Sequence, residues 1–167
     1  MISPLCVKMP ELPEIETLVS ELHQALRGKI ISGVEIRNES ILTSAREEFE
    51  GKIEGREIVQ VTRRGKYIRI DLSSSLTLWF HLGMTGQLLL ENSLSSLRAH
   101  THFILSFANL PRQLLYRDVR RFGRVLLTQA DEESLPPGVR RLGLEPSEWN
   151  PKDFIARFKA RHGRIKN

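Results

Sequence analysis

The sequence has little cysteine, few aromatic residues and no long apolar run, and each shortage excludes a class of protein. Cys6 is the single cysteine among 167 residues, so one copy can form neither an internal disulfide bond nor a cysteine-based zinc site. No apolar stretch approaches the roughly 18 residues of a membrane span. The leading segment MISPLCVK is too short for a secretory signal peptide. We therefore expect a cytoplasmic protein without membrane contact.

Aromatic residues make up 7% of the chain, whereas the formal net charge is +5 and the isoelectric point lies near 9.7. A basic surface favours a polyanionic partner such as nucleic acid. Proteins that bind single strands without sequence preference stack the bases on exposed aromatic side chains. The sequence has no clustered aromatic set on a strand face, so a basic sheet domain that binds single strands is a weak alternative.

The first regular element that the pattern predicts is a helix from Pro13 to Arg27. Pro13 suits a first turn, the carboxylates of Glu14 and Glu16 complement the positive end of a helix, and Gly28 is a natural stop. We interpret Glu16 as a favourable end charge and no more. Apolar residues at helical spacing define one face: Ile15, Leu18, Val19, Leu22 and Leu26.

From Lys29 to Gln129 the pattern changes to short runs of alternating apolar residues separated by Gly, Asn, Ser and Pro. About eight such runs predict a mainly β fold, a two-layer sandwich of antiparallel strands behind an N-terminal helix. Helical patterns are nearly absent between these runs, and Lys52 is assigned to a linker. Pro136-Pro137-Gly138 predicts a domain boundary. A further helix is expected after Asn150, its N-cap.

The run MPELPEIET places Pro10 behind Met9 and a carboxylate, Glu11, behind the proline. If translation starts at Met9 and the methionine is removed, Pro10 presents a secondary amine with a pKa of roughly 8. Such an amine can attack an electrophilic carbon and form an iminium, with Glu11 as the acid or base. In the chain as numbered, an amide bond occupies that nitrogen. An ordinary extended lead-in to the helix is the alternative interpretation.

Further motifs follow in order: RRGKY at 63–67, HLGMTG at 81–86, DVRRFG at 118–123 and LGLEP at 142–146. Together with MPELPEIET, they resemble the formamidopyrimidine-DNA glycosylase family of base-excision repair enzymes. The resemblance runs from Met9 to the last residue. It implies removal of oxidised purines, such as 8-oxoguanine and formamidopyrimidines, with lyase activity at abasic sites. PELPE, rather than PEGPE, resembles the purine-lesion branch.

The resemblance implies catalytic roles for three residues. Pro10 is the nucleophile at the anomeric carbon and forms the Schiff base, Glu11 handles the proton steps, and Lys66 supports catalysis while contacting phosphate. Basic residues close together suit a phosphate track. For Arg63 and Arg64, however, we expect general surface charge rather than specific contacts.

Met84, Arg120 and Phe122 match the three residues that the family inserts into the duplex when a nucleotide is extruded. The glycines of both motifs indicate turns, where large apolar side chains are exposed. The alternative is that Met84 and Phe122 are core residues at hairpin ends. Val119 stands where the family commonly has proline, which predicts a less rigid loop.

His100 and His102 lie two residues apart, so on a strand they would share a face. They could begin a metal site, but the sequence offers no suitable third ligand nearby. The resemblance implies contacts with the DNA backbone, although Thr101 replaces the acid that is usual between them. For His81 we expect a structural role.

The resemblance also implies a helix-two-turn-helix domain and a zinc finger after the sandwich. Residues 9–138 are assigned to the catalytic domain and 139–167 to a linker and the first helix of the second domain, with Lys166 contacting DNA. Residues 1–8 are assigned to an extension. The zinc finger is expected beyond Asn167, so no cofactor and no metal site are expected in this chain.

The expected partner is double-stranded DNA that contains oxidised bases or abasic sites, bound by a monomer in a bacterial-type, nucleoid-associated setting. A chain that stops within the second domain is expected to be a poor enzyme. The competing hypothesis is therefore a non-catalytic fragment that binds damaged DNA, inactive through truncation or through a blocked Pro10.

Overall fold

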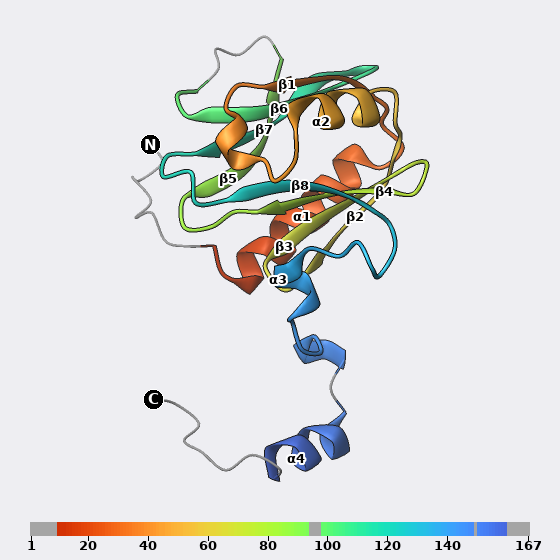
Figure 1. Ribbon diagram of the computed structural model, residues 1–167, viewed down its shortest axis with the longest axis vertical. Coiled ribbons are helices and arrows are strands. Elements are labelled where there is room, and N and C mark those ends of the chain that lie inside the picture. The colour runs from red at the N-terminus through yellow and green to blue at the C-terminus, as the bar shows by residue number, and fades with distance from the viewer. Residues whose placement is uncertain (1–9, 94–97, 149, 160–167) are drawn as a thin grey trace.

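The computed structural model describes residues 10–93, 98–148 and 150–159, and in these residues two antiparallel sheets of four strands each face one another (Figure 1). One sheet has the strand order β1-β6-β7-β5 and the other β2-β3-β4-β8. The predicted two-layer sandwich is confirmed. The strands are β1 (Ile31–Ile36), β2 (Ile58–Arg64), β3 (Tyr67–Leu72), β4 (Leu76–His81), β5 (Gly86–Asn92), β6 (Thr101–Phe107), β7 (Leu110–Asp118) and β8 (Arg124–Gln129).

The helix α1 (Leu12–Leu26) precedes the sheets and agrees with the predicted helix to within a residue at each end. The backbone N–H of Glu11 donates a hydrogen bond to the Glu14 carboxylate over 3.2 Å, which completes a capping box. Gly28 follows the helix with a φ of +75°, a left-handed conformation that glycine adopts without a steric penalty. The sequence therefore fixes both ends of α1 locally.

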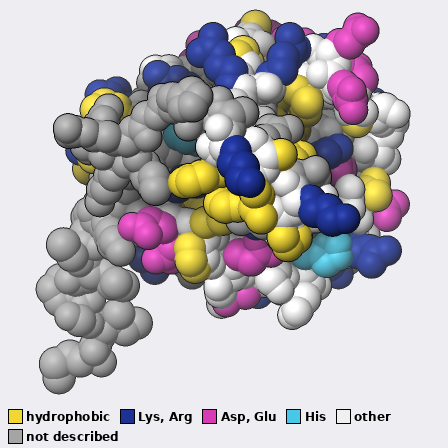
Figure 2. All heavy atoms as spheres, turned by 90° about the horizontal axis from the view of Figure 1, so that it is seen from below, with side chains coloured by type: hydrophobic (Ala, Val, Ile, Leu, Met, Phe, Trp, Pro, Cys, Tyr) yellow, Lys and Arg dark blue, Asp and Glu magenta, His cyan; other side chains and the backbone are white. Residues whose placement is uncertain are grey.

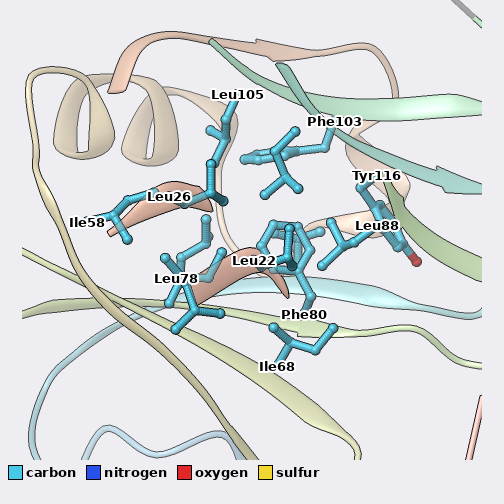
Figure 3. Packing of buried hydrophobic residues seen from close by; sticks show 14 of the residues in the cluster. Leu22, Leu26, Ile58, Ile68, Leu78, Phe80, Leu88, Phe103, Leu105 and Tyr116 are labelled. Atoms are coloured by element: carbon cyan, nitrogen blue, oxygen red, sulfur yellow. The ribbon is translucent and has the colours of Figure 1, made fainter. Parts of the chain in front are cut away.

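The core lies between the two sheets and includes the apolar face of α1 (Figure 3). The rings of Phe80, Phe103 and Tyr116 meet across the interface, with centroids 5.8 Å apart for Phe80–Phe103 and 5.9 Å apart for Phe80–Tyr116. Burial of each large apolar side chain contributes about 1.5–3 kcal/mol. Residues from both layers contribute, among them Leu22, Leu26, Ile58, Ile68, Leu78, Leu88 and Leu105.

Two short helices interrupt the strands where we expected none: η1 (Glu39–Ile41) and α2 (Arg46–Ile53). Only Phe49 and Ile53 of α2 are buried, one helical turn apart. Two apolar residues within eight positions are too few for a periodicity argument. Lys52 lies on this helix and pairs with Glu48 over 2.5 Å, so its assignment to a linker was wrong.

The chain stays in contact with the sandwich past the predicted boundary at 136–138. Val139 in α3 (Pro137–Arg140) is buried, and a Cβ on Gly138 would come within 2.0 Å of the Tyr67 hydroxyl oxygen. A 3₁₀ turn, η2 (Pro146–Glu148), follows. The segment that follows the predicted boundary therefore packs on the sandwich.

The helix α4 (Pro151–Lys159) begins at the predicted residue and stands apart from both sheets in Figure 1. Phe154 and Phe158 stack with ring centroids 5.9 Å apart, and both are about half exposed, as is Ile155.

On the side of the molecule seen in Figure 2, hydrophobic side chains gather next to Lys and Arg side chains. None of the helices in the described residues is long and apolar enough to cross a membrane.

Candidate functional site

Two tight turns bring Met84, Arg120 and Phe122 together at one end of the sandwich. Met84 lies between β4 and β5, and the other two residues lie between β7 and β8. The Arg120 guanidinium is 3.5 Å from the Met84 sulfur, and its Cζ lies 4.5 Å from the centroid of the Phe122 ring. Met84 is 41% exposed and Phe122 is 52% exposed. These three residues, called the tip cluster below, are surface residues, so the core alternative was wrong.

The two turns pack backbone against backbone. Gly83 has a φ of +61°, and a Cβ at this position would lie 2.8 Å from the Gly123 nitrogen. A Cβ on Gly123 would meet the Tyr116 hydroxyl oxygen at 1.9 Å. Arg121 adopts a left-handed φ of +57° between Arg120 and Phe122. The glycines that indicated turns are therefore also needed for the close approach of one turn to the other.

The two histidines do not share a strand face, so that expectation was wrong. His100 has a left-handed φ of +65° and precedes β6, where it is exposed. His102 is buried, with Nε2 placed 2.7 Å from the carbonyl oxygen of Asp118. Because a carbonyl oxygen only accepts, Nε2 carries the proton and donates. His102 is thus positioned to stabilise the β6–β7 pair, whereas His100 is the accessible ring.

The turn between β2 and β3 presents Lys66, and its neighbours are held by carboxylates. Arg63 is largely buried, and its guanidinium donates to Glu145 over 2.6 Å and also pairs with Glu16. The other Glu145 oxygen accepts from the Gly65 N–H over 2.6 Å. Burial alone would raise the pKa of Glu145, but the hydrogen bonds from Arg63 and Gly65 outweigh it and lower that pKa.

Arg64 binds the same C-terminal segment. Its guanidinium donates to the Gly143 carbonyl oxygen over 2.7 Å and to the Glu148 carboxylate over 3.3 Å. Leu142 packs against Gly65, where a Cβ would come within 2.8 Å of its Cδ1. Our interpretation of Arg63 and Arg64 as general surface charge was therefore wrong. So was the interpretation of Glu16 as an end charge only.

His81, at the end of β4, lies between the Lys66 turn and the tip cluster. Its ring centroid is 4.7 Å from that of Tyr67. Burial lowers the pKa of His81, and the positive charges of Lys66 and Arg124 lower it further. A neutral, packed imidazole fits the structural role that we expected for this residue.

Pro10 and Glu11 form the lead-in to α1. Pro10 is half-buried and Glu11 is exposed at the N-cap position. Residues 1–9 lie outside the described residues, and so does Lys166, which we expected to contact DNA. Across the described ranges, no three His, Cys, Asp or Glu side chains gather closely enough to hold a metal ion.

Sequence reasoning missed two residues that organise this surface, Asp118 and Glu145. Each belongs to a motif that we identified, DVRRFG and LGLEP, but a carboxylate inside a motif carries no sign of which backbone groups it will meet. Asp118 is fully buried, and the Glu145 side chain is largely buried. For Glu145 the available signal was an acid in an apolar, glycine-containing run, because buried acids are rare unless they are paired. Asp118 stands among arginines, so its sequence neighbours gave no sign that it is buried.

Residues 9–125 match the family described as formamidopyrimidine-DNA glycosylase N-terminal domain. The chain belongs to the formamidopyrimidine-DNA glycosylase family. The formamidopyrimidine-DNA glycosylase of Pelotomaculum thermopropionicum is 39% identical over 161 residues, covering 95% of this chain and 58% of that protein. The enzyme of the same name from Desulforamulus reducens is 40% identical over 163 residues, with the same coverage of 95% and 58%. The chain thus spans less than two thirds of the length of these relatives.

Solved structures agree with this membership. The Lactococcus lactis Fpg in complex with DNA containing N7-benzyl-Fapy-dG superposes with a TM-score of 0.70 at 32% identity, over 74% of this chain and 45% of that one. The complex of the Lactococcus lactis Fpg with abasic-site DNA gives a TM-score of 0.70 at 31% identity, over 74% and 46%.

Proposed function

We propose that this chain carries the catalytic domain of a DNA repair glycosylase that removes oxidised purines from double-stranded DNA and then cleaves at the abasic site. Family membership supports the reaction class, and the DNA lesions in the complexes of the Lactococcus lactis Fpg support the substrate class. The observation that carries the proposal is the tip cluster. Met84, Arg120 and Phe122 reach the surface together although they come from two separate turns.

A base within the duplex is inaccessible, so an enzyme that acts on it must extrude the nucleotide and fill the gap. The side chains of Met84 and Phe122 are apolar and exposed, which suits insertion between base pairs. Arg120 carries the donors that an orphaned partner base would accept. The arrangement therefore combines a wedge with a polar replacement for the lost base.

Pro10 supplies the nucleophile when translation starts at Met9 and that methionine is removed. Its nitrogen attacks the anomeric carbon, the glycosidic bond breaks, and the bonding electrons leave with the damaged base, which takes up a proton. Glu11 protonates the sugar ring oxygen as the ring opens to an iminium. The iminium acidifies the adjacent carbon, and loss of that proton expels the phosphate on the 3′ side.

Phosphate contacts are assigned to Lys66 and His100. Arg63 and Arg64 already carry carboxylate partners, so Lys66 is the cation of its turn that is proposed for the DNA backbone. His100 is exposed at the start of β6, next to the strand that ends in the tip-cluster turn. The basic character of the chain adds sequence-independent attraction.

The test compares a chain beginning at Pro10 with one beginning at Met1 on a duplex that contains one 8-oxoguanine. We expect free 8-oxoguanine and a cleaved strand only with the chain that begins at Pro10. Equal activity of both chains would contradict the proline mechanism. Lesion-selective binding without base release by either chain would favour the non-catalytic DNA-binding alternative.

A further inference from the structure

Asp118 is a fully buried acid at the end of β7, at the point where the two tip turns meet. Its Oδ1 accepts from the Thr85 hydroxyl and, over 3.2 Å, from the backbone N–H of Arg120. Its Oδ2 accepts from the backbone N–H of Gly123 over 2.9 Å and from the Tyr116 hydroxyl over 3.2 Å. Both carboxylate oxygens therefore accept two hydrogen bonds each.

Three of these four partners belong to the tip cluster or adjoin it in the sequence, and the fourth, Tyr116, lies on β7. Thr85 directly follows Met84, and Gly123 directly follows Phe122. Arg120 belongs to the tip cluster, and its backbone N–H is bonded to the Asp118 carboxylate. The same N–H also lies 3.2 Å from the Thr85 hydroxyl oxygen. One carboxylate thus joins both turns, and each tip side chain is at most one residue from a group bonded to it.

The backbone of Asp118 is fixed as firmly as its side chain. Its carbonyl oxygen accepts from the His102 ring over 2.7 Å, and its N–H donates to the His100 carbonyl oxygen over 3.0 Å.

All four donors to the carboxylate are neutral groups. A buried acid is costly, and stability alone would be served as well by apolar packing. Four aligned donors instead define a single loop geometry.

We propose that Asp118 is a positioning residue that holds Met84, Arg120 and Phe122 in their inserted arrangement before DNA binds. The inference rests on the proposed function, because it gives the tip cluster its task. Groups already ordered in the bound geometry lose little conformational entropy on binding. Supporting hydrogen bonds behind a functional side chain serve this purpose.

Asp118→Asn tests the inference. Asparagine keeps one acceptor oxygen, but its amide NH₂ must face donors such as the Gly123 N–H. The first readout is the fluorescence of 2-aminopurine opposite a tetrahydrofuran abasic analogue in a duplex, which reports insertion without requiring catalysis. We expect the wild-type chain to change this fluorescence and Asp118→Asn to lose most of the change at saturating protein.

The second readout is chemistry, measured with chains that begin at Pro10. Excision from an 8-oxoguanine duplex should fall roughly 10- to 100-fold in Asp118→Asn, the size of effect expected when supporting groups are misplaced. Cleavage of a single-stranded oligonucleotide with an abasic site needs no extrusion, so it should be nearly unchanged. Equal losses on both substrates would overturn the positioning role.

Asp71→Asn is the matched control. Asp71 is also buried and accepts from Gln60 over 2.6 Å and from Thr77 over 2.8 Å, but it lies in the β2–β3–β4 region away from the tip turns. The Asp71→Asn variant should be less stable than the wild type, but the ratio of its activity on the duplex to its activity on the single strand should not change. An Asp71→Asn variant that lowers this ratio as much as Asp118→Asn would overturn the inference.

Thr85 provides a second variant in case Asp118→Asn does not fold. Thr85→Val removes one donor to the carboxylate and should lower the ratio, whereas Thr85→Ser keeps the hydroxyl and should restore it. Should the wild-type chain prove inactive on both substrates while still changing the fluorescence, the proposed function fails and the positioning role stands. A folded Asp118→Asn variant that gives the wild-type fluorescence change would contradict the positioning role of Asp118.

Discussion

The backbone N–H of Gly65 donates a hydrogen bond to a Glu145 carboxylate oxygen over 2.6 Å, across 80 positions of sequence. The same carboxylate accepts from Arg63. The turn that presents Lys66 is therefore bound by a segment that follows β8 and is not part of either sheet. This contact links the position of a proposed catalytic residue to the segment that leads toward α4.

Glu145→Gln should lower the free energy of unfolding by about 2 kcal/mol, because it removes the charge from a largely buried acceptor of charged hydrogen bonds. Thermal or urea denaturation measures the loss. Lys52→Ala is the control, since its exposed pair with Glu48 should contribute less than about 0.5 kcal/mol. Similar losses in both variants would show that the Glu145 contacts add nothing beyond surface charge.

Lys66→Ala should weaken DNA binding and flatten the plot of log affinity against log salt concentration by about one unit, the effect of one lost phosphate contact. Lys52→Ala removes the same charge from α2 and should leave the slope unchanged. The measurement is a salt titration of binding to an abasic-analogue duplex. The same slope change in both variants would leave Lys66 as one more surface cation.

Gly83→Ala should lower both the stability of the protein and its excision activity, because it disturbs the contact between the two tip turns. A Cβ at this left-handed position would lie 2.8 Å from the Gly123 nitrogen, and backbone atoms there cannot move without displacing Phe122. We expect a loss of at least about 1 kcal/mol in stability and a loss of excision activity. Gly51→Ala, in an open position of α2, should instead stabilise by roughly 0.5–1 kcal/mol. A neutral Gly83→Ala would contradict the tight contact between the turns.

Acid should destabilise the protein partly through Asp118. Burial would raise the pKa of this acid, but its hydrogen bonds, the Thr85 hydroxyl first among them, lower it. An acid whose pKa is lower in the folded state than in the unfolded state stabilises the fold. This stabilisation is fully present above the pKa of the unfolded state, about 3.9, and is lost as the pH falls through the pKa of the folded state. Asp118→Asn should therefore show a shallower loss of stability than wild type below about pH 4. Parallel curves would refute this assignment.

The sequence predicted the fold well because its signals are local. Short apolar runs separated by turn residues, the proline and glycine at the ends of α1, and Pro151 at the start of α4 all act within a few residues. The helix α2 was missed because only Phe49 and Ile53 mark its buried face. A pattern of that length does not distinguish a helix from a loop.

The site was predictable only where a motif reaches the surface on its own. Met84 and Phe122 are exposed as the turn glycines indicated. Arg63 was misassigned to general surface charge because its partner Glu145 comes from the docked C-terminal segment, far away in the sequence. His102 was wrongly placed on one face with His100 because the pairing of strands brings its ring to the Asp118 carbonyl. Charge at a position is visible in a sequence, but the partner that neutralises it is not.

The central claim is that a free Pro10 amine is the nucleophile, and borohydride trapping followed by peptide mapping tests it most directly. A chain verified by intact mass to begin at Pro10 is incubated with an abasic-site duplex and borohydride, which reduces an iminium to a stable amine. The account predicts a covalent complex whose DNA remnant maps to Pro10, and no complex from a chain that begins at Met1. Efficient trapping by the Met1 chain, or a remnant on a lysine such as Lys66, would contradict the account.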